Sequence, residues 1–309
     1  MNNYFQNMQK IESGLSKKKI FRKIDKNLNK IFIDFSNDKN EFFDFLKVYQ
    51  ILKKTNISIP KIYEVHLNKK IIVMEDFGDN RFDKIYKEKD LFYLLKIAVD
   101  NLIAIHNSLN SNDLCQLKQY SYSDFKIEIS EFVDYFIPYK SISDFPKNEF
   151  YSSWEYIFNI EKFDLTSFAH KDYEFINLIF LKDNKCHFKC GIIDFQSAFK
   201  GFIGWDLFSV LENSRINFPR KYNEKLIKYF YNNVNVGMNF KTFRNQYYLL
   251  NLGRQTRLLG RWIKLLNEKN TMKYKNYINT TQVRINECLN NIQSDRLRDI
   301  YLKVLKSNV

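Results

Sequence analysis

The stretch Phe168–Leu207, FAHKDYEFINLIFLKDNKCHFKCGIIDFQSAFKGFIGWDL, decides the fold that this sequence predicts. It contains His170, Asp172 and Asn177 in the spacing H-x-D-x4-N. The apolar residues that follow Asn177 suit a short buried strand, a polar turn comes next, and a second apolar run ends at Asp194. A strand, a turn and a returning strand would carry Asp194 back to Asp172 and Asn177, so we expect these three side chains to converge.

Phosphoryl transfer needs such a set of groups. One carboxylate accepts the proton of the attacking hydroxyl, while an amide and a second carboxylate hold Mg²⁺ on the nucleotide phosphates. Protein kinases carry these groups as an H-R-D loop with a downstream Asn and as D-F-G. The corresponding residues here are HKD at 170–172 and DFQ at 194–196. We therefore predict Asp172 as the catalytic residue, Asn177 and Asp194 as metal ligands, and His170 as loop support.

The same stretch resembles the aminoglycoside phosphotransferase superfamily, and within it the bacterial anomeric kinases of N-acetylmuramate and N-acetylglucosamine. Those kinases typically carry I-D-F-Q-D-A, then Gly, then a D-L pair, and this chain has IDFQSA at 193–198, Gly201 and Asp206-Leu207. The resemblance implies an α+β, bilobal, protein-kinase-like fold. A small antiparallel β-sheet lobe that binds the nucleotide is expected at 1–77, and a larger helical lobe with the catalytic and acceptor sites at 78–309.

The resemblance also implies a function. It predicts a small-molecule kinase with an alcohol group as acceptor, which uses ATP and Mg²⁺ to phosphorylate the anomeric hydroxyl of N-acetylmuramate or N-acetylglucosamine in cell-wall sugar recycling. An aminoglycoside or choline-type acceptor would use the same core and stays an alternative. A nucleotide-binding scaffold without turnover is the alternative from another class. The segment 174–176 departs from the usual small or basic loop residues, which leaves the acceptor open.

Several residues are expected to line the nucleotide. Gly and Ser in the turn at 12–16 would let backbone N–H groups approach the phosphates. The segment 74–77 would join the lobes beside the base, and two isoleucines near the catalytic motifs would form an apolar floor. The predicted set is Gly14, Ser16, Arg22, Met74, Glu75, Phe77, Ile179 and Ile193.

The lysine that protein kinases carry on their third strand has no obvious counterpart here. The strand predicted at 30–35 has Asp34 near that place, so Arg22 and Lys19 are the candidate phosphate cations. A helix capped by Asn37-Asp38 should follow, and Glu41 or Asp44 would be its acidic partner. Residues 1–12 are expected to form a helix or an arm.

The second half of the chain reads as mostly helical. By the resemblance, Asp206 braces the catalytic loop at the start of a helix. A long amphipathic helix is predicted at 240–266, and its Arg254 and Arg257 are candidates for substrate contact or for a solvated basic face. Further helix is expected at 274–307.

Composition is that of a globular chain, with 309 residues, 45% hydrophobic and a formal charge of +14 from 49 basic and 35 acidic residues. Because the lysines are spread evenly, compositional bias explains the charge better than a nucleic-acid partner. The start lacks a signal-peptide pattern and no apolar run is long enough to span a membrane, so a cytoplasmic location is expected. The resemblance implies a small-molecule partner. The pattern C-H-x-x-C at 186–190 lacks the four ligands of a zinc site.

Overall fold

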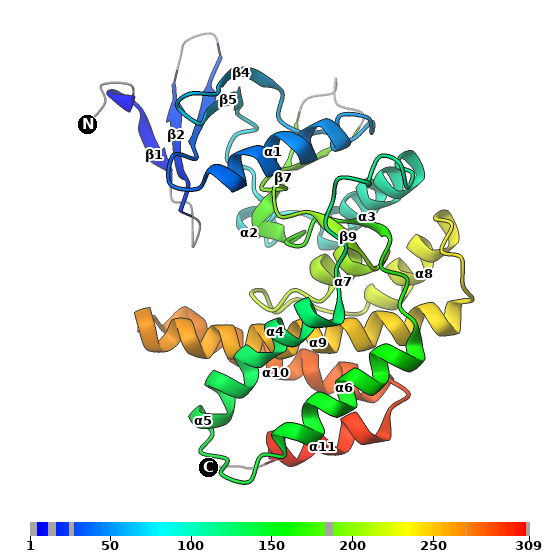
Figure 1. Ribbon diagram of the computed structural model, residues 1–309. Coiled ribbons are helices and arrows are strands. Elements are labelled where there is room, and N and C mark those ends of the chain that lie inside the picture. Colours follow the sequence, from blue (N-terminus) through cyan, green and yellow to red (C-terminus); the bar gives the residue numbers. More distant parts are fainter. Residues whose placement is uncertain (1–4, 12–16, 25–27, 183–187, 270, 307–309) are drawn as a thin grey trace. The chain divides into compact units, whose positions relative to one another are not determined.

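The computed structural model describes residues 5–11, 17–24, 28–182, 188–269 and 271–306 (Figure 1). The chain forms two compact units, each from two separate segments. The first unit comprises Met1–Gln116 and His170–Ala198, and the second comprises Leu117–Ala169 and Phe199–Val309. The lobe boundary expected between residues 77 and 78 stays a prediction.

The first unit contains a five-stranded antiparallel sheet with the order β1-β2-β3-β5-β4. Its strands are β1 (Gln9–Ile11), β2 (Lys19–Lys23), β3 (Lys30–Asp34), β4 (Ile62–His66) and β5 (Ile71–Glu75). β3 lies in the centre and its β-branched and aromatic side chains are buried, as the alternating pattern predicted. The expectation of a helix or arm over residues 1–12 is wrong for β1, because this short edge segment is stabilised by pairing with β2.

Helix α1 (Lys39–Leu52) begins where the sequence predicted a cap. The Asp38 carboxylate accepts a hydrogen bond from the Glu41 backbone N–H at 3.0 Å, which satisfies one of the donors that every helix start exposes. The apolar side of the helix buries Phe42 and Phe45, whose rings lie 5.9 and 5.6 Å from that of Phe35. This packing fixes α1 against the end of β3.

The remaining elements of the first unit hold the loop and hairpin that the sequence predicted. They are α2 (Phe82–Ile85), α3 (Leu91–Ser108), the 3₁₀ turn η3 (Phe175–Asn177), β7 (Leu178–Phe180) and β8 (Cys190–Ile192). β7 and β8 pair antiparallel, with Leu178 opposite Ile192. Asn101 of α3 donates to the Cys190 carbonyl at 2.6 Å, so the hairpin is tied to the helix beneath it.

The second unit is helical apart from the short pair β6 (Ser167–Ala169) and β9 (Phe199–Gly201). Its helical elements are α4 (Tyr122–Glu131), the π-helix η2 (Phe132–Phe136), α5 (Ile137–Tyr139), α6 (Lys147–Glu161), α7 (Trp205–Leu211), α8 (Asn223–Asn233), α9 (Phe240–Lys269), α10 (Met272–Asn291) and α11 (Asp295–Lys306). Helix α9 extends the predicted segment 240–266 by three residues and packs along α10. Gly260 allows α9 to approach η2 closely, because a Cβ there would lie 2.2 Å from the Glu131 backbone.

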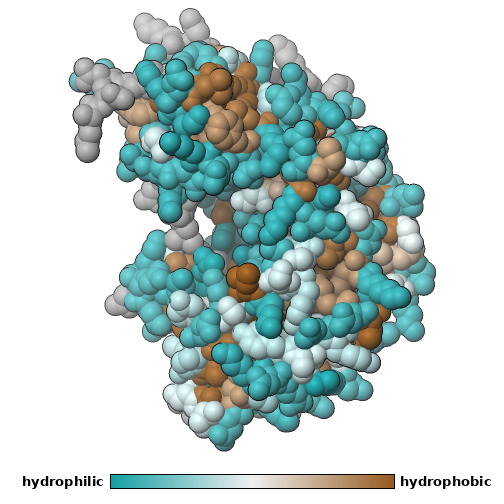
Figure 2. Space-filling view, in the orientation of Figure 1, coloured by the Kyte–Doolittle hydropathy of each residue, from teal (hydrophilic) through white to brown (hydrophobic). Residues whose placement is uncertain are grey.

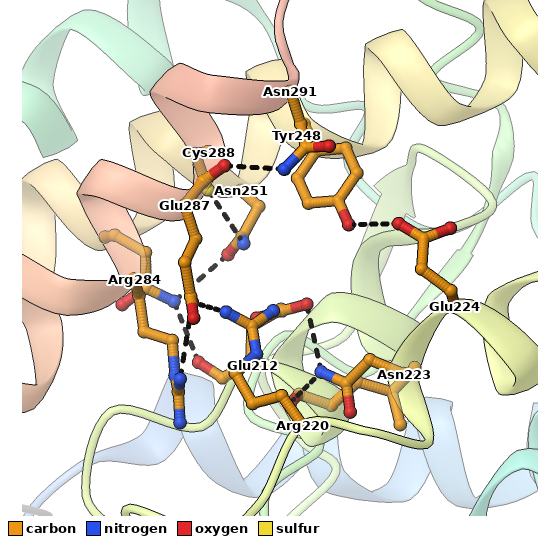
Figure 3. A network of polar contacts seen from close by, with 12 residues as sticks. Glu212, Arg220, Asn223, Glu224, Tyr248, Asn251, Arg284, Glu287, Cys288 and Asn291 are labelled. Carbon is orange, nitrogen blue, oxygen red and sulfur yellow. Dashed lines mark hydrogen bonds and ion pairs between the residues drawn. The ribbon is translucent and has the colours of Figure 1, made fainter.

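A buried polar network joins α8, α9 and α10 to the end of α7 (Figure 3). Glu212, 1% exposed, forms an ion pair with Arg220 and accepts hydrogen bonds from Asn223 and Tyr247, both at 3.2 Å. Arg220 also pairs with Glu287. Burial and the neighbouring Arg220 charge lower the pKa of Arg284 to about 10. Such charges are tolerated inside a protein only when they are paired, so the network should fix how these helices pack.

Hydrophilic side chains cover most of the face seen in Figure 2, and hydrophobic side chains gather only in smaller patches. Large exposed hydrophobic residues are found on separate elements, such as Phe43 on α1, Ile127 on α4 and Met272 on α10. Single exposed apolar residues of this kind are ordinary for a folded chain. None of the helices in the described ranges combines the length and apolar character needed to cross a membrane.

Candidate active site

The loop that carries the H-x-D-x4-N residues is held in an unusual backbone conformation. Lys171 has φ 81°, in the left-handed region that non-glycine residues rarely adopt. Asp172 is half-buried, and its carbonyl accepts hydrogen bonds from the Glu174 N–H at 2.9 Å and from the Asn177 Nδ2 at 2.8 Å. The Tyr173 hydroxyl donates to the Ala98 carbonyl at 2.9 Å, which anchors the loop to α3. Backbone strain maintained by several contacts is typical of functional loops.

His170 supports the loop from inside the first unit. Its ring is 1% exposed, and Nε2 lies 3.1 Å from the Ile193 carbonyl oxygen. Burial lowers the pKa of His170 below its ordinary value, although Asp172 and Asp194 act in the opposite direction. A neutral ring that donates from Nε2 therefore connects the catalytic loop to the residue before Asp194.

The β7–β8 hairpin brings Asn177 and Asp194 together, as the sequence predicted. Pairing of Leu178 with Ile192 places the residues just beyond them side by side, and the Ile193 N–H donates to the Asn177 carbonyl at 3.1 Å. Asp194 has φ 65° and is thus a second non-glycine residue in the left-handed region.

Asn177 and Asp194 fit the chemistry of a magnesium site. Because the Asn177 Nδ2 donates to Asp172, its Oδ1 is the atom that remains to face a cation. One amide and one carboxylate oxygen suffice for Mg²⁺, which takes its other ligands from phosphates and water. No group of three or more His, Cys, Asp or Glu side chains in the described part of the chain could hold a metal by itself.

Asp194 is also part of a charge cluster with Lys18, which immediately precedes β2, and with Glu41 of α1. The Lys18 ammonium forms an ion pair with Asp194 and lies 3.5 Å from the Glu41 carboxylate. The Gln196 Nε2 donates to Glu41 at 2.9 Å and to Asp194 at 3.1 Å. Although burial raises the pKa of Asp194, Lys18, Gln196 and His170 outweigh that effect and hold it below its usual range. Asp194 is therefore ionised at neutral pH.

Phe195 locks this cluster against helix α1. Its side chain is 1% exposed, and its ring lies 4.7 Å from that of Phe45 and 6.5 Å from that of Tyr49. Glu41 lies on the same helix and pairs with Lys18, as expected for the acidic residue of this helix, whereas Asp44 pairs with Lys47 at 2.6 Å. The position of Asp194 thus depends on the position of α1.

The residues predicted beside the base lie in the segment 74–77 and on the β7–β8 hairpin. Phe77 packs on Gly191, where an added Cβ would lie 2.6 Å from its ring. Ile179 is bridged to Arg81 directly after this link. Met74 is buried in β5, and Glu75 exchanges hydrogen bonds with the Lys61 backbone. Ile193 immediately precedes Asp194. These residues share one region of the first unit, and their contact with a nucleotide stays a prediction.

The two predicted phosphate cations, Arg22 and Lys19, stand apart from the contacts that Lys18 makes with Asp194 and Glu41, and their role stays a prediction. The guanidinium of Arg22 binds Asp76 at 2.7 Å and Asp79 at 2.9 Å, so it connects β2 to the segment after β5. Lys19 is exposed and stands opposite Asp34 in the β2–β3 pairing. Gly14 and Ser16 lie outside the described residues. Lys18, the middle lysine of three, was not singled out from the sequence, because only the folded structure reveals its burial.

The remaining predicted residues belong to the second unit. Asp206 is 1% exposed in the first turn of α7, and Arg254 is 2% exposed in α9. Arg257 lies 3.9 Å from the Glu128 carboxylate on α4. The roles of Asp206 in bracing the loop and of the two arginines in binding substrate stay predictions.

In the first unit, burial raises the pKa of Cys190, as expected for a structural cysteine, while residues 186 and 187 lie outside the described ranges.

Comparisons with known proteins agree with this geometry. No protein-family model matches the chain. An N-acetylmuramate/N-acetylglucosamine kinase of Caulobacter vibrioides is 25% identical over 247 residues, which are 77% of this chain and 68% of that protein. A choline/ethanolamine kinase family protein from Mesorhizobium loti matches with a TM-score of 0.59 and 12% identity, over 99% of this chain and 94% of that chain. An aminoglycoside 2'-phosphotransferase in complex with GDP matches with a TM-score of 0.61 and 12% identity, over 93% and 92%.

The predicted fold class is confirmed by these matches and by the presence of both a small antiparallel sheet and a larger helical part. The predicted resemblance is confirmed as well, since the similar proteins are kinases and phosphotransferases that act on hydroxyl acceptors. The chain therefore has the protein-kinase-like fold of these choline kinase and aminoglycoside phosphotransferase structures, and its sequence is similar to that of a curated sugar kinase.

Proposed function

We propose that this protein is an ATP- and Mg²⁺-dependent kinase of a small sugar, which phosphorylates the anomeric hydroxyl of N-acetylmuramate or N-acetylglucosamine. The observation that carries the proposal is the convergence of Asn177 and Asp194 at the end of the β7–β8 hairpin, beside the strained loop of Asp172. The sugar is suggested by the Caulobacter vibrioides relative and by the IDFQ sequence at 193–196. Because ATP is the donor, a cytoplasmic location belongs to the proposal.

In this mechanism each polar group has a separate task. The Asp172 carboxylate orients the sugar hydroxyl and accepts its proton as the oxygen attacks the γ-phosphorus, while the bond from the γ-phosphorus to the bridging oxygen breaks and ADP leaves. The Asn177 Oδ1 and the Asp194 carboxylate hold the cation site. Mg²⁺ bound there would neutralise the phosphate charge and align the transferred group. His170 keeps the loop at a fixed distance from Asp194 through its bond to the Ile193 carbonyl. Positioning and charge neutralisation supply most of the rate.

ATP consumption against a panel of acceptors tests the proposal. The panel contains N-acetylmuramate, N-acetylglucosamine, other hexoses, choline and aminoglycosides, each with Mg²⁺. Asp172→Asn should lower turnover by about 10²–10⁴-fold while ATP binding is retained, because only the proton acceptor changes. Asp44→Asn is a matched control, since this aspartate pairs with Lys47 on the surface of α1.

The outcome of this panel separates the alternatives. Turnover on an amino sugar that is lost in Asp172→Asn supports the sugar kinase. Turnover on choline or an aminoglycoside alone would assign the other acceptor class that the fold accommodates. ATP binding without turnover on any acceptor would favour the nucleotide-binding scaffold. If Asp172→Asn were as active as the parent enzyme, the assigned proton acceptor would be wrong.

A further inference from the structure

We propose that Lys18, the residue immediately before strand β2, is the lysine that binds the nucleotide phosphates, a role that protein kinases give to a lysine of strand β3. This inference rests on the proposed kinase function. It concerns a residue next to the predicted turn at 12–16, and neither the motifs nor the relatives assign it. The argument uses the position of Lys18 in the sheet, the lysine that β3 does contain, and the charges of the cluster.

Lys18 reaches the place that a lysine of β3 would occupy. In the antiparallel pairing Lys19 stands opposite Asp34, so Lys18 lies one position further along, beside Phe35. Its ammonium is 5.9 Å from the centre of the Phe35 ring, and its side chain is 3% exposed. Neighbouring strands are only about 4.8 Å apart, so a long side chain can supply the same ammonium from either strand.

Strand β3 itself cannot supply this ammonium. Its lysine is Lys30, at the opposite end of the strand, where Nζ lies 3.9 Å from the Glu64 carboxylate of β4. At the near end, the Asp34 Oδ1 accepts a hydrogen bond from the Ser36 N–H at 2.8 Å. Asp34 therefore shapes the turn into α1, which explains why an aspartate stands where a phosphate-binding lysine was expected.

The partners of Lys18 are those that a phosphate-binding lysine needs. Active protein kinases require an ion pair between this lysine and a glutamate of the following helix, and Glu41 of α1 lies 3.5 Å from the Lys18 ammonium. Lys18 also pairs with Asp194, the predicted metal ligand. Two carboxylates around one ammonium leave a net negative charge, and Asp194 is 37% exposed. When Asp194 binds a cation that enters with the phosphates, Lys18 can turn toward a phosphate oxygen while Glu41 still holds it.

Affinity labelling with an acyl-phosphate derivative of ATP tests this placement directly. The lysine amine nearest the terminal phosphate attacks the acyl carbon. A C–N bond forms, the bond from the acyl carbon to the phosphate oxygen breaks, ATP leaves and the amine proton passes to solvent. Mass spectrometry of the full chain should locate the acyl group on Lys18, and excess MgATP should prevent the labelling.

Kinetic variants provide a second measurement. Lys18→Met should lower kcat/KM for ATP by about 10²–10³-fold, as for the loss of one charge-stabilising donor, and Lys18→Arg should recover part of it. Lys23→Met is the matched control, because this lysine is exposed at the other end of β2. The melting temperature of each variant shows whether a loss of activity reflects unfolding.

The results separate this inference from the proposed function. MgATP-protected labelling at Lys18 together with the loss in Lys18→Met would support it. Protected labelling at another lysine, such as Lys19 or Lys171, would overturn the role of Lys18 and leave the kinase proposal standing. The same holds if folded Lys18→Met retained full activity. If no lysine were labelled and ATP did not bind, the kinase proposal and the role of Lys18 would fall together.

Discussion

Gln196 offers a test of the charge cluster that does not depend on the acceptor. Its Nε2 donates to Glu41 at 2.9 Å and to Asp194 at 3.1 Å, and the residue is 8% exposed. Gln196→Glu keeps the shape of the side chain but replaces the amide donor by a carboxylate, the third beside those of Glu41 and Asp194. We expect a loss of stability that grows with pH, whereas Gln196→Met removes the same hydrogen bonds without adding a charge.

The size of the effect follows from the contacts. Two like charges roughly 4 Å apart repel by about 4 kcal/mol at an effective dielectric constant of 20. The new carboxylate would meet two such neighbours, but Lys18 attracts it and water reaches Asp194, which is 37% exposed. We therefore expect a penalty of about 2–4 kcal/mol in the free energy of unfolding, relative to Gln196→Met, once the new group is ionised.

The pH dependence has a definite sign. Repulsion raises the folded-state pKa of the new carboxyl above its unfolded value of about 4.3. Between those two pKa values the folded protein binds more protons than the unfolded chain, so stability falls as pH rises. The penalty should thus be absent near pH 4 and complete at pH 8. Urea unfolding of both variants at several pH values measures the difference. A difference that stays constant with pH would refute the assigned geometry.

Two further predictions concern titratable groups outside this cluster. Glu212→Ala should lower the free energy of unfolding by about 3–5 kcal/mol, because Arg220 would lose a buried partner. Glu224→Ala is the control: the Glu224 side chain is 55% exposed in its ion pair, so its loss should change the free energy of unfolding by less than about 1 kcal/mol. Equal urea midpoints for the two variants would contradict this prediction. Burial lowers the pKa of His106 to about 4, whereas the unfolded chain has an ordinary histidine pKa near 6.5. The unfolded chain therefore takes up the proton first, and stability should fall as pH drops from about 6.5 toward 4. His106→Gln should flatten that part of the plot of melting temperature against pH, and an unchanged slope would argue against a neutral histidine.

Much of the fold was predictable because its signals are local. The apolar runs around 178–180 and 190–192 specify a hairpin, and the cap at Asp38 with an apolar stripe specifies α1. Elements without a local pattern were not predictable. Strand β1 exists through its pairing with β2, and the helix expected at 274–307 divides into α10 and α11. The π-helical turn at Phe132–Phe136 borders Glu131, whose backbone meets Gly260 across the helix interface, a contact distant in sequence.

In the candidate site, too, the residues with a local sequence signal could be predicted and those without one could not. Asp172, Asn177 and Asp194 could be proposed from sequence because one hairpin brings them together, and a hairpin is visible as two apolar runs with a turn. The lysine that we propose as phosphate ligand could not be predicted, because the three adjacent lysines at 17–19 have the same chemistry and differ in the structure by their burial.

Burial and charge favour one of these three lysines. An ammonium that is withdrawn from water needs carboxylate partners, and among Lys17, Lys18 and Lys19 it is Lys18 that is buried against Glu41 and Asp194. A kinase site requires an ammonium between the acidic residue of the helix and the metal-binding carboxylate, but it does not require a particular strand to deliver it. On our proposal, the position of the charge is therefore what matters, and the lysine that supplies it can stand beside β3 instead of within it.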